Sequence, residues 1–333
     1  MTSYLSSRSQ FVKLGDVKSI TSLIEFGVPQ GSILGPILFL LFINDLPNAT
    51  KLFVKLYADD TFLCAQNDDI KLLVKEVNLE LTNVFKWLCS NKLTLNFSKT
   101  KYMVLTKKRD VSHSFTVKMG GKKLQECNTY KYLGVMFDKD LNWKSHIEYI
   151  CSKISKAVGG LAKLRYCADI EILREVYFAL IHLYVRYGII AWGNITKTNV
   201  KPLNVILNRA IRIMSFAPFS GKVELKPLYH QLQIMDIDQT FKFEVGKFMY
   251  KSKNNILPTE IAKHFENEVL PEQKLGLRKK ENNTIPKILT RSSSGEKSIQ
   301  TRGEQHWANI PPYLKDLDSF ASFKRFLKSH LLE

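Results

Sequence analysis

The spacing of apolar residues changes near residue 141, and this change constrains the fold more than any other feature of the chain. Before it, short stretches of β-forming residues alternate with turn residues, whereas after it apolar residues recur every three or four positions. The first helical stripe is Trp143, Ile147, Ile150, Ile154, Val158 and Leu161. Two later stripes are Ile172, Val176, Leu180 and Val185, then Leu203, Leu207, Ala210 and Met214. A β-rich part followed by a helical part predicts an α+β fold that divides between residues 140 and 141.

The β-rich part contains one strong hairpin signal. β-forming residues fill Phe53–Ala65 and are interrupted in the middle by Asp59 and Asp60, which predicts a hairpin with two acids at its tip. Asp68 or Asp69 can cap a helix that follows. The apolar stripe of this helix is Leu73, Val77, Leu81, Val84, Phe85 and Leu88.

Shorter elements are expected around this hairpin and helix. Residues 5–28 alternate short apolar and polar runs about glycines, which is typical of small strands and turns. The apolar run Ile37–Leu46 predicts a buried helix or a buried strand, and its length does not decide between them. Further strands are predicted at Leu93–Phe97, Tyr102–Leu105, Phe115–Met119 and Tyr130–Phe137, with Gly120 and Gly121 as a hairpin turn.

The end of the chain has a different composition. Residues 251–333 hold five prolines and a stretch rich in Ser and Lys at 291–298. This composition predicts an irregular tail that ends in a basic amphipathic segment, Phe320–Leu332. The predicted domains are therefore residues 1–140, 141–250 and 251–333.

Charge is distributed unevenly along the chain. The 49 basic residues outnumber the 31 acidic ones and give a net charge of +18, yet residues 1–60 are neutral, with five of each sign. The segment Lys99–Lys123 holds eight basic residues and one acid. Such an excess favours a polyanionic partner, and the alternative is that the lysines only solvate the surface.

Other classes of protein fit the sequence poorly. The first residues lack the apolar core of a signal peptide, and the longest apolar run, Ile37–Ile43, is too short to span a membrane. None of the five cysteines lies in a C-x-x-C pair, which argues against a disulfide framework or a zinc knuckle. We therefore expect an intracellular chain, in the nucleus or the cytoplasm, that is not secreted and has no membrane partner.

Two adjacent acids at a hairpin tip call for an explanation. Side-by-side carboxylates repel each other unless a cation lies between them, and Mg²⁺ binds carboxylate oxygens together with substrate phosphates. For an isolated pair, a solvated acidic turn is the more common reading, because turns favour Asp for backbone reasons.

The surrounding residues change that balance. The acids lie within Leu56–Thr61, which reads LYADDT, and the upstream stretch Gly27–Phe39 reads GVPQGSILGPILF. In this order and spacing, the two motifs resemble the reverse transcriptases, and among them the jockey-like non-LTR (LINE-type) retrotransposons. Further stretches that resemble the family are Lys86–Trp87, Asn91–Asn96, Lys99–Lys101, Tyr132–Val135, Tyr187–Gly188, Ala191–Gly193 and Arg209–Arg212. The resemblance covers residue 4 to about residue 250.

This resemblance implies RNA-directed DNA synthesis by a right-hand polymerase, with a partial palm over residues 1–140 and a helical thumb over residues 141–250. An RNA template, a DNA primer and deoxynucleoside triphosphates would be its partners, and its oligomeric state is left open. Asp59 and Asp60 would hold two Mg²⁺ ions, or Mn²⁺ in their place. Lys99 is the third catalytic candidate, acting on the leaving phosphate.

The resemblance also implies binding roles for other residues. Tyr57 would pack beneath the primer end, and Pro29, Gln30 and Gly31 would lie against the new base pair. Four residues, Tyr132, Leu133, Gly134 and Val135, would form the primer grip. Contacts to the nucleic-acid backbone are expected from Lys101, Lys107, Lys108, Arg109, Lys153 and Lys156.

One expected residue is missing. The family carries another metal-binding Asp on a strand well before the GVPQG loop, and the only earlier acids here, Asp16 and Glu25, do not fit that position. We therefore expect a truncated polymerase that is inactive alone. A non-catalytic nucleic-acid-binding remnant of a retroelement is the alternative. An intron-encoded maturase is a weaker one, because no sign of a splicing domain follows the thumb.

Overall fold

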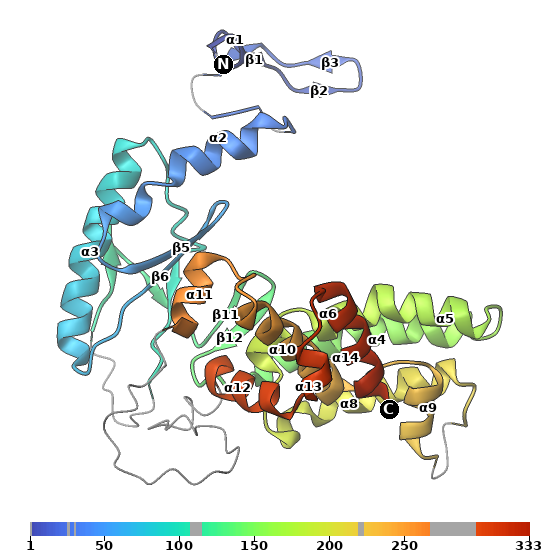
Figure 1. Cartoon of the computed structure of the whole chain (residues 1–333). Coiled ribbons are helices and arrows are strands. Elements are labelled where there is room, and N and C mark those ends of the chain that lie inside the picture. The colour runs from blue at the N-terminus through green and yellow to red at the C-terminus, as the bar shows by residue number, and fades with distance from the viewer. Residues whose placement is uncertain (1, 25–26, 30, 107–114, 219–222, 267–297) are drawn as a thin grey trace, which may run out of the picture. The chain divides into compact units, whose positions relative to one another are not determined.

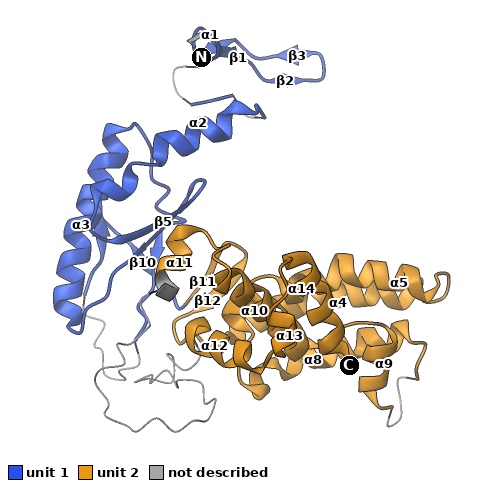
Figure 2. Cartoon of the chain, in the orientation of Figure 1, with its two compact units in different colours: residues 1–128 blue, residues 129–333 orange. Residues whose placement is uncertain are grey.

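The computed structural model describes residues 2–24, 27–29, 31–106, 115–218, 223–266 and 298–333. It consists of two compact units, Met1–Asn128 and Thr129–Glu333 (Figure 2). Small, mostly antiparallel sheets and many helices make up the described chain (Figure 1). The expected mixture of helices and short strands is confirmed at this level.

The first unit begins with small strands, as expected. After α1 (Thr2–Leu5), β1 (Ser9–Gln10) pairs antiparallel with β4 (Ser22–Leu23). Between them, β2 (Lys13–Leu14) and β3 (Val17–Lys18) form a hairpin. Gly15, at a φ of 58°, supplies the left-handed backbone that this turn needs.

The apolar run at residues 37–46 is helical but is not buried. Helix α2 (Leu34–Ile43) has Pro36 in its first turn, where a missing N–H costs nothing. Ile37 is 52% exposed and Leu41 is 69% exposed, so the prediction of a buried element is wrong for the described residues. Only Gly35 and Ile43 of this helix are buried, and the apolar composition of the run did not reveal this.

The acidic hairpin and the helix after it are confirmed. Strands β5 (Phe53–Tyr57) and β6 (Asp60–Cys64) pair antiparallel, after the short η1 helix (Leu46–Ala49). Helix α3 (Ile70–Ser90) follows, and the Asp69 carboxylate caps it by accepting a 2.7 Å hydrogen bond from the N–H of Lys71. The core of the unit is Ile43, Leu46, Leu52, Leu81, Val84, Val117, Met119 and Leu124, with Leu56 and Leu63 of the hairpin packed against it.

The remaining strands of this unit are shorter than predicted. They are β7 (Lys101–Tyr102), β8 (Lys118–Met119), β9 (Lys122–Lys123) and β10 (Gln125–Glu126). β8 and β9 turn at Gly120 and Gly121, as predicted, and β7 pairs with β10 in parallel. The strand predicted at Leu93–Phe97 is wrong, because the Asn96 side chain bonds the backbone that follows and folds it into a turn.

The second unit opens with a hairpin where one strand was predicted. Strands β11 (Thr129–Tyr132) and β12 (Val135–Asp138) pair antiparallel through the whole predicted strand 130–137. Leu133 and Gly134 have φ values of 45° and 82°, so the chain reverses there. A leucine at positive φ is unusual, and for that reason the sequence pattern gave no sign of the turn.

The first and third helical stripes are confirmed. Helices α4 (Lys144–Leu164) and α8 (Lys197–Met214) pack against each other and bury every residue of those stripes except Trp143, which is the N-cap.

The second helical stripe is wrong by one position over its first three residues. Ile172 and Leu180 are exposed, and the buried residues are Leu173, Tyr177 and Ile181, whereas Val185 is buried as predicted. The helical path there is α5 (Ile170–Tyr177), a π-helical turn (Phe178–His182), α6 (Leu183–Arg186) and α7 (Ile189–Trp192).

The tail predicted to be irregular is largely helical where it is described. The last helices are α9 (Leu225–Gln231), α10 (Ile237–Lys253), α11 (Thr259–Glu266), α12 (Ile299–Asn309), α13 (Pro312–Lys315) and α14 (Phe320–Leu332). α10 packs against α12 and α14 around Phe243, Tyr250, Phe323 and Leu327. The prolines misled the prediction because Pro311 and Pro312 begin α13 instead of breaking a helix. None of the described helices combines the length and the apolar character that a membrane span requires.

Candidate functional site

The two adjacent acids lie at the exposed end of the β5–β6 hairpin. Tyr57 pairs with Asp60, which leaves Ala58 and Asp59 as a two-residue turn. Ala58 takes a φ of 49°, and this left-handed backbone is what a tight two-residue hairpin turn requires. Asp59 therefore stands in the turn itself, and Asp60 is the first residue of the returning strand.

The two faces of this hairpin have different surroundings. Val54, Leu56 and Leu63 point toward the core, because side chains alternate along a strand. The opposite face is exposed and consists of Phe53, Lys55, Tyr57, Asp60, Phe62 and Cys64. The register thus brings the phenol of Tyr57, 64% exposed, to the same face as the Asp60 carboxylate.

A buried carboxylate fixes the start of this hairpin. Glu80 of α3 accepts 2.7 Å hydrogen bonds from the N–H of Lys51 and from the hydroxyl of Thr50, just before β5. These bonds, the one from Lys51 first, hold the pKa of Glu80 below its usual value. Sequence reasoning missed Glu80, since a glutamate inside a helix gives no sign of burial.

The donor set at the tip fits part of a divalent-cation site. Asp59 and Asp60 supply hard oxygen ligands, which Mg²⁺ and Mn²⁺ prefer. Neither carboxylate forms an ion pair with any of the described residues. No set of three or more His, Cys, Asp or Glu side chains gathers into a metal site anywhere in the part of the chain that the structure describes.

The GVPQG loop is tightly packed against the first turn of α2. The carbonyl oxygen of Pro29 accepts a 2.8 Å hydrogen bond from the hydroxyl of Ser32, which also accepts one from the N–H of Gly35. A β carbon at Gly35 would lie 2.9 Å from the Ser32 hydroxyl oxygen and 3.2 Å from the Pro29 oxygen, so the close approach favours glycine. Gly31 is at a φ of 82°, and the predicted base-pair contact Gln30 lies outside the described residues.

Lys99 is carried by the Asn96 turn. The Asn96 carboxamide oxygen accepts hydrogen bonds from the N–H of Ser98 and the N–H of Lys99. Lys101 follows on β7 and is exposed. The other predicted backbone contacts of this segment, Lys107, Lys108 and Arg109, lie outside the described residues.

The predicted primer grip is the turn of the β11–β12 hairpin in the second unit. Val135 is buried, Tyr132 and Leu133 are half-buried, and Gly134 is exposed. The phenol of Tyr187 donates a 2.6 Å hydrogen bond to the carbonyl oxygen of Leu133. Tyr187 and the next residue, Gly188, were recognised only as family motifs, and the structure shows what they contact.

The exposed side of α4 presents the two lysines predicted to contact the backbone. Lys153 and Lys156 are both exposed. The ammonium of Lys153 lies 5.6 Å from the centre of the Tyr149 ring. Lys131, on β11, lies 4.7 Å from the same centre and donates a 3.0 Å hydrogen bond to the phenol. Two cations therefore flank one tyrosine on this side of the second unit.

Two buried polar residues join β12 to α4. Asp138 accepts hydrogen bonds from the N–H groups of Asn142 and Trp143, at 2.9 and 2.8 Å. Nδ1 of His146 accepts a 3.2 Å hydrogen bond from the N–H of Met136, and burial lowers the pKa of His146 to about 4. Both are positioning residues for the hairpin.

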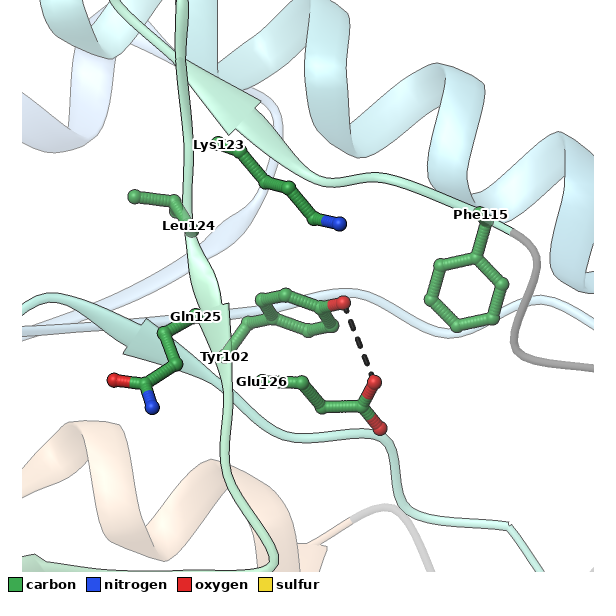
Figure 3. A pocket seen from close by; sticks show the side chains of 6 residues that line it. All are labelled: Tyr102, Phe115, Lys123, Leu124, Gln125 and Glu126. Atoms are coloured by element: carbon green, nitrogen blue, oxygen red, sulfur yellow. Dashed lines mark hydrogen bonds between the residues drawn. The ribbon is translucent and has the colours of Figure 1, made fainter.

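One surface pocket of about 430 Å³ lies in the first unit. Figure 3 shows the Tyr102 phenol directed at the Glu126 carboxylate across this pocket, with a hydrogen bond of 3.4 Å. Its lining is Tyr102, Phe115, Lys123, Leu124, Gln125 and Glu126. None of the predicted site residues lines it, so the pocket is not the predicted nucleotide site.

Comparison with known proteins shows which family the chain resembles. Residues 3–137 match the family described as reverse transcriptase (RNA-dependent DNA polymerase). The chain is 28% identical over 259 residues to a probable RNA-directed DNA polymerase from transposon BS of Drosophila melanogaster, covering 74% of this chain. It is 22% identical over 272 residues, or 78% of this chain, to the RNA-directed DNA polymerase from mobile element jockey of the same fly.

The chain is similar to the jockey-like non-LTR reverse transcriptases. A further relative is the retrovirus-related Pol polyprotein from type-1 retrotransposable element R1 2 of Nasonia vitripennis, 27% identical over 186 residues, which are 51% of this chain and 44% of that protein. The chain spans only 28% and 29% of the length of the two fly polymerases.

Proposed function

We propose that this chain carries out part of RNA-directed DNA synthesis, as the region of a right-hand polymerase that holds the acidic hairpin of the palm and the helical thumb. The proposal rests on the exposed pair Asp59 and Asp60 at the tip of the β5–β6 hairpin. Tyr57 lies on the same face of the hairpin as Asp60. The similarity to reverse transcriptases supports DNA synthesis as the reaction. The exposed acids support the tip of the β5–β6 hairpin as the place where it occurs.

The two carboxylates have the chemistry for this role. A divalent cation bound there, Mg²⁺ or Mn²⁺, would stabilise the charge on the attacking 3′ oxygen and on the leaving pyrophosphate. Tyr57 offers an exposed ring on which the primer end can pack. Gly31, which is exposed, and Pro29, which is half-buried, would lie against the new base pair, and Lys99 would neutralise the leaving phosphate.

The second unit would bind the RNA template and DNA primer. The Leu133–Gly134 turn serves as the primer grip, and the lysines on the exposed side of α4 contact phosphates. We assign residues 1–140 to the palm and residues 141–250 to the thumb, because the long helices α4 and α8 pack against each other and provide a support for such a basic surface.

The acidic tip needs a third carboxylate for full activity. Among the described residues, β5 and β6 pair only with each other. Their outer edges can therefore accept another strand, and a strand carrying the remaining Asp could join there. We expect the chain alone to bind its substrates and to synthesise little or no DNA.

Two measurements on the purified chain test the proposal. Mn²⁺ binding is followed by water-proton relaxation, and D59N/D60N should abolish it, whereas D68N/D69N, a matched pair of acids after the hairpin, should not. Primer extension on poly(rA)/oligo(dT) with Mg²⁺ measures activity.

Equal Mn²⁺ binding by D59N/D60N and the wild type would overturn the assignment of the acidic tip. Robust synthesis by the chain alone, abolished by D59A, would overturn the need for a third carboxylate.

A non-catalytic nucleic-acid-binding role is the second candidate, and the net charge of +18 favours it. Salt-dependent binding of primer–template together with no Mn²⁺ binding at the tip would support this candidate over the first.

A further inference from the structure

A cluster of cations lies where α6, α10 and α14 meet in the second unit, outside every site predicted from the sequence. At its centre, the two carboxylate oxygens of Glu244 are both occupied. Oε1 accepts from Nε of Arg186 at 2.5 Å, and Oε2 accepts from Nζ of Lys247 at 2.7 Å. The Glu244 and Lys247 side chains are only 13% and 12% exposed, so this central ion pair is largely withdrawn from water.

Two lysines of α14 add charge to this centre. Lys324 acts electrostatically on Lys247, and Lys328 acts on the neighbouring His182. They lie one helical turn apart and therefore on the same side of α14. Neither forms an ion pair with a described residue, and both oxygens of Glu244 already accept from other cations.

The cluster therefore has a large excess of positive charge. We call Arg186, Lys247, Lys324 and Lys328 the α14 cation cluster, and of these four cations only Arg186 and Lys247 pair with the Glu244 carboxylate. His182 adds no charge at neutral pH, because burial and then Arg186 lower its pKa to about 4. Burial first, and then Arg186 and Lys324, also lower the pKa of Lys247. Nearby positive charges thus already act on one another, and an added anion would relieve this repulsion.

We propose that the α14 cation cluster binds the phosphate backbone of a nucleic acid. This proposal rests on the proposed function, because it assumes that the chain binds nucleic acid. It adds a role for the C-terminal helices away from the polymerase site. Lys324 is exposed and Lys328 is half-exposed, so both can reach a phosphate without breaking the Glu244 ion pairs.

The structure favours a nucleic acid over an anionic lipid surface. A helix that lies on a membrane inserts its apolar face between the lipids. The apolar face of α14 is already used, because Phe323 and Leu327 are fully buried against α10. The basic side of the helix is thus free for a soluble polyanion. Phe326, 43% exposed, is the one large apolar side chain of α14 that is exposed, and a single ring makes no apolar face for insertion.

The experiment compares K324Q/K328Q with K71Q/K75Q, a matched pair of exposed lysines one turn apart on α3. Fluorescence anisotropy measures the Kd of the full chain for an RNA–DNA hybrid at several salt concentrations. K324Q/K328Q should weaken binding roughly tenfold and lower the slope of log K against log salt by about 1 to 2, whereas K71Q/K75Q should change neither. K324R/K328R should retain binding, because arginine keeps the charge.

Each outcome separates this site from the acidic tip. Unchanged hybrid binding by K324Q/K328Q, with normal Mn²⁺ binding at Asp59 and Asp60, overturns the cluster and leaves the proposed function in place. Weakened hybrid binding with no Mn²⁺ binding supports the cluster and overturns the polymerase assignment. Tighter binding to phosphatidylserine vesicles than to the hybrid overturns the choice of ligand. Thermal unfolding of each variant confirms that it is folded.

Discussion

The phenol of Tyr187 donates a 2.6 Å hydrogen bond to the carbonyl oxygen of Leu133. This bond joins residues 54 positions apart and fixes the turn of the β11–β12 hairpin to the segment after α6. Leu133 has a φ of 45°, a conformation that costs about 1–2 kcal/mol for a residue other than glycine. The hydrogen bond helps to hold the proposed primer grip in this unfavourable shape.

Replacing Tyr187 with Phe removes only this hydroxyl. We expect Y187F to lower the free energy of unfolding by about 1 kcal/mol, because a net hydrogen bond contributes about that much. The Kd for primer–template should rise up to about fivefold if the turn then samples other conformations. Urea unfolding and anisotropy measure the two quantities. A loss of stability with an unchanged Kd would show that Tyr187 supports the fold without positioning the grip.

Gly134 lies against the same tyrosine. A β carbon there would stand 3.1 Å from Cε1 of Tyr187, at a φ of 82°. We therefore expect G134A to destabilise the chain by more than the ~1–2 kcal/mol of the backbone term alone. G121A is the matched control, since Gly121 has a φ of 76° and open space around the added carbon. Equal losses of stability in the two variants would contradict a steric role for Tyr187.

Glu80 gives the first unit a dependence on pH. Its folded-state pKa is lowered, so its stabilisation is complete above the unfolded-state pKa and is lost as pH falls through the folded-state value. We expect E80Q to cost about 1–3 kcal/mol at pH 7, because the oxygen that accepts from both the Lys51 N–H and the Thr50 hydroxyl would become neutral and accept more weakly. The difference from the wild type should shrink below pH 4. E76Q, at an exposed position of the same helix, should leave the urea midpoint unchanged.

The sequence predicted the elements with strong local signals and missed those decided by packing. The β5–β6 hairpin, the Asp69 cap and the core stripe of α4 follow from residue type and spacing. The turn at Leu133 does not, because a tertiary hydrogen bond helps to hold a leucine in a glycine-like conformation. Near Ile172 the apolar period allowed two faces, and the π-helical turn Phe178–His182 shifts which of them is buried.

The candidate site divides in the same way. Asp59, Asp60 and Tyr57 were found because a hairpin with a two-residue tip determines which side chains share a face. Glu80, Asp138 and Tyr187 act through buried or long-range hydrogen bonds, which leave no periodic pattern. The sequence predicted that the segment of α14 is basic and amphipathic. It did not predict that α6 and α10 lie beside α14, and the α14 cation cluster depends on the packing of these three helices.

His146 should make the second unit sensitive to acid. Burial lowers its pKa from about 6.5 to about 4, so between these values the unfolded state binds more protons than the folded state. Stability should therefore fall as pH decreases from 6.5 to 4, by up to about 3 kcal/mol for this residue. Protonation of Nδ1 would also remove the acceptor for the Met136 N–H.

Two variants separate the titration of His146 from its hydrogen bond. H146Q can still accept from the Met136 N–H and does not titrate, so its unfolding free energy should vary less with pH than that of the wild type. H146L should show the same flatter profile but lower stability at pH 7, because the N–H is left without an acceptor. Urea unfolding between pH 4 and pH 7 measures both. A profile for H146Q as steep as that of the wild type would assign the acid sensitivity to other groups, with the buried His182 the first of them.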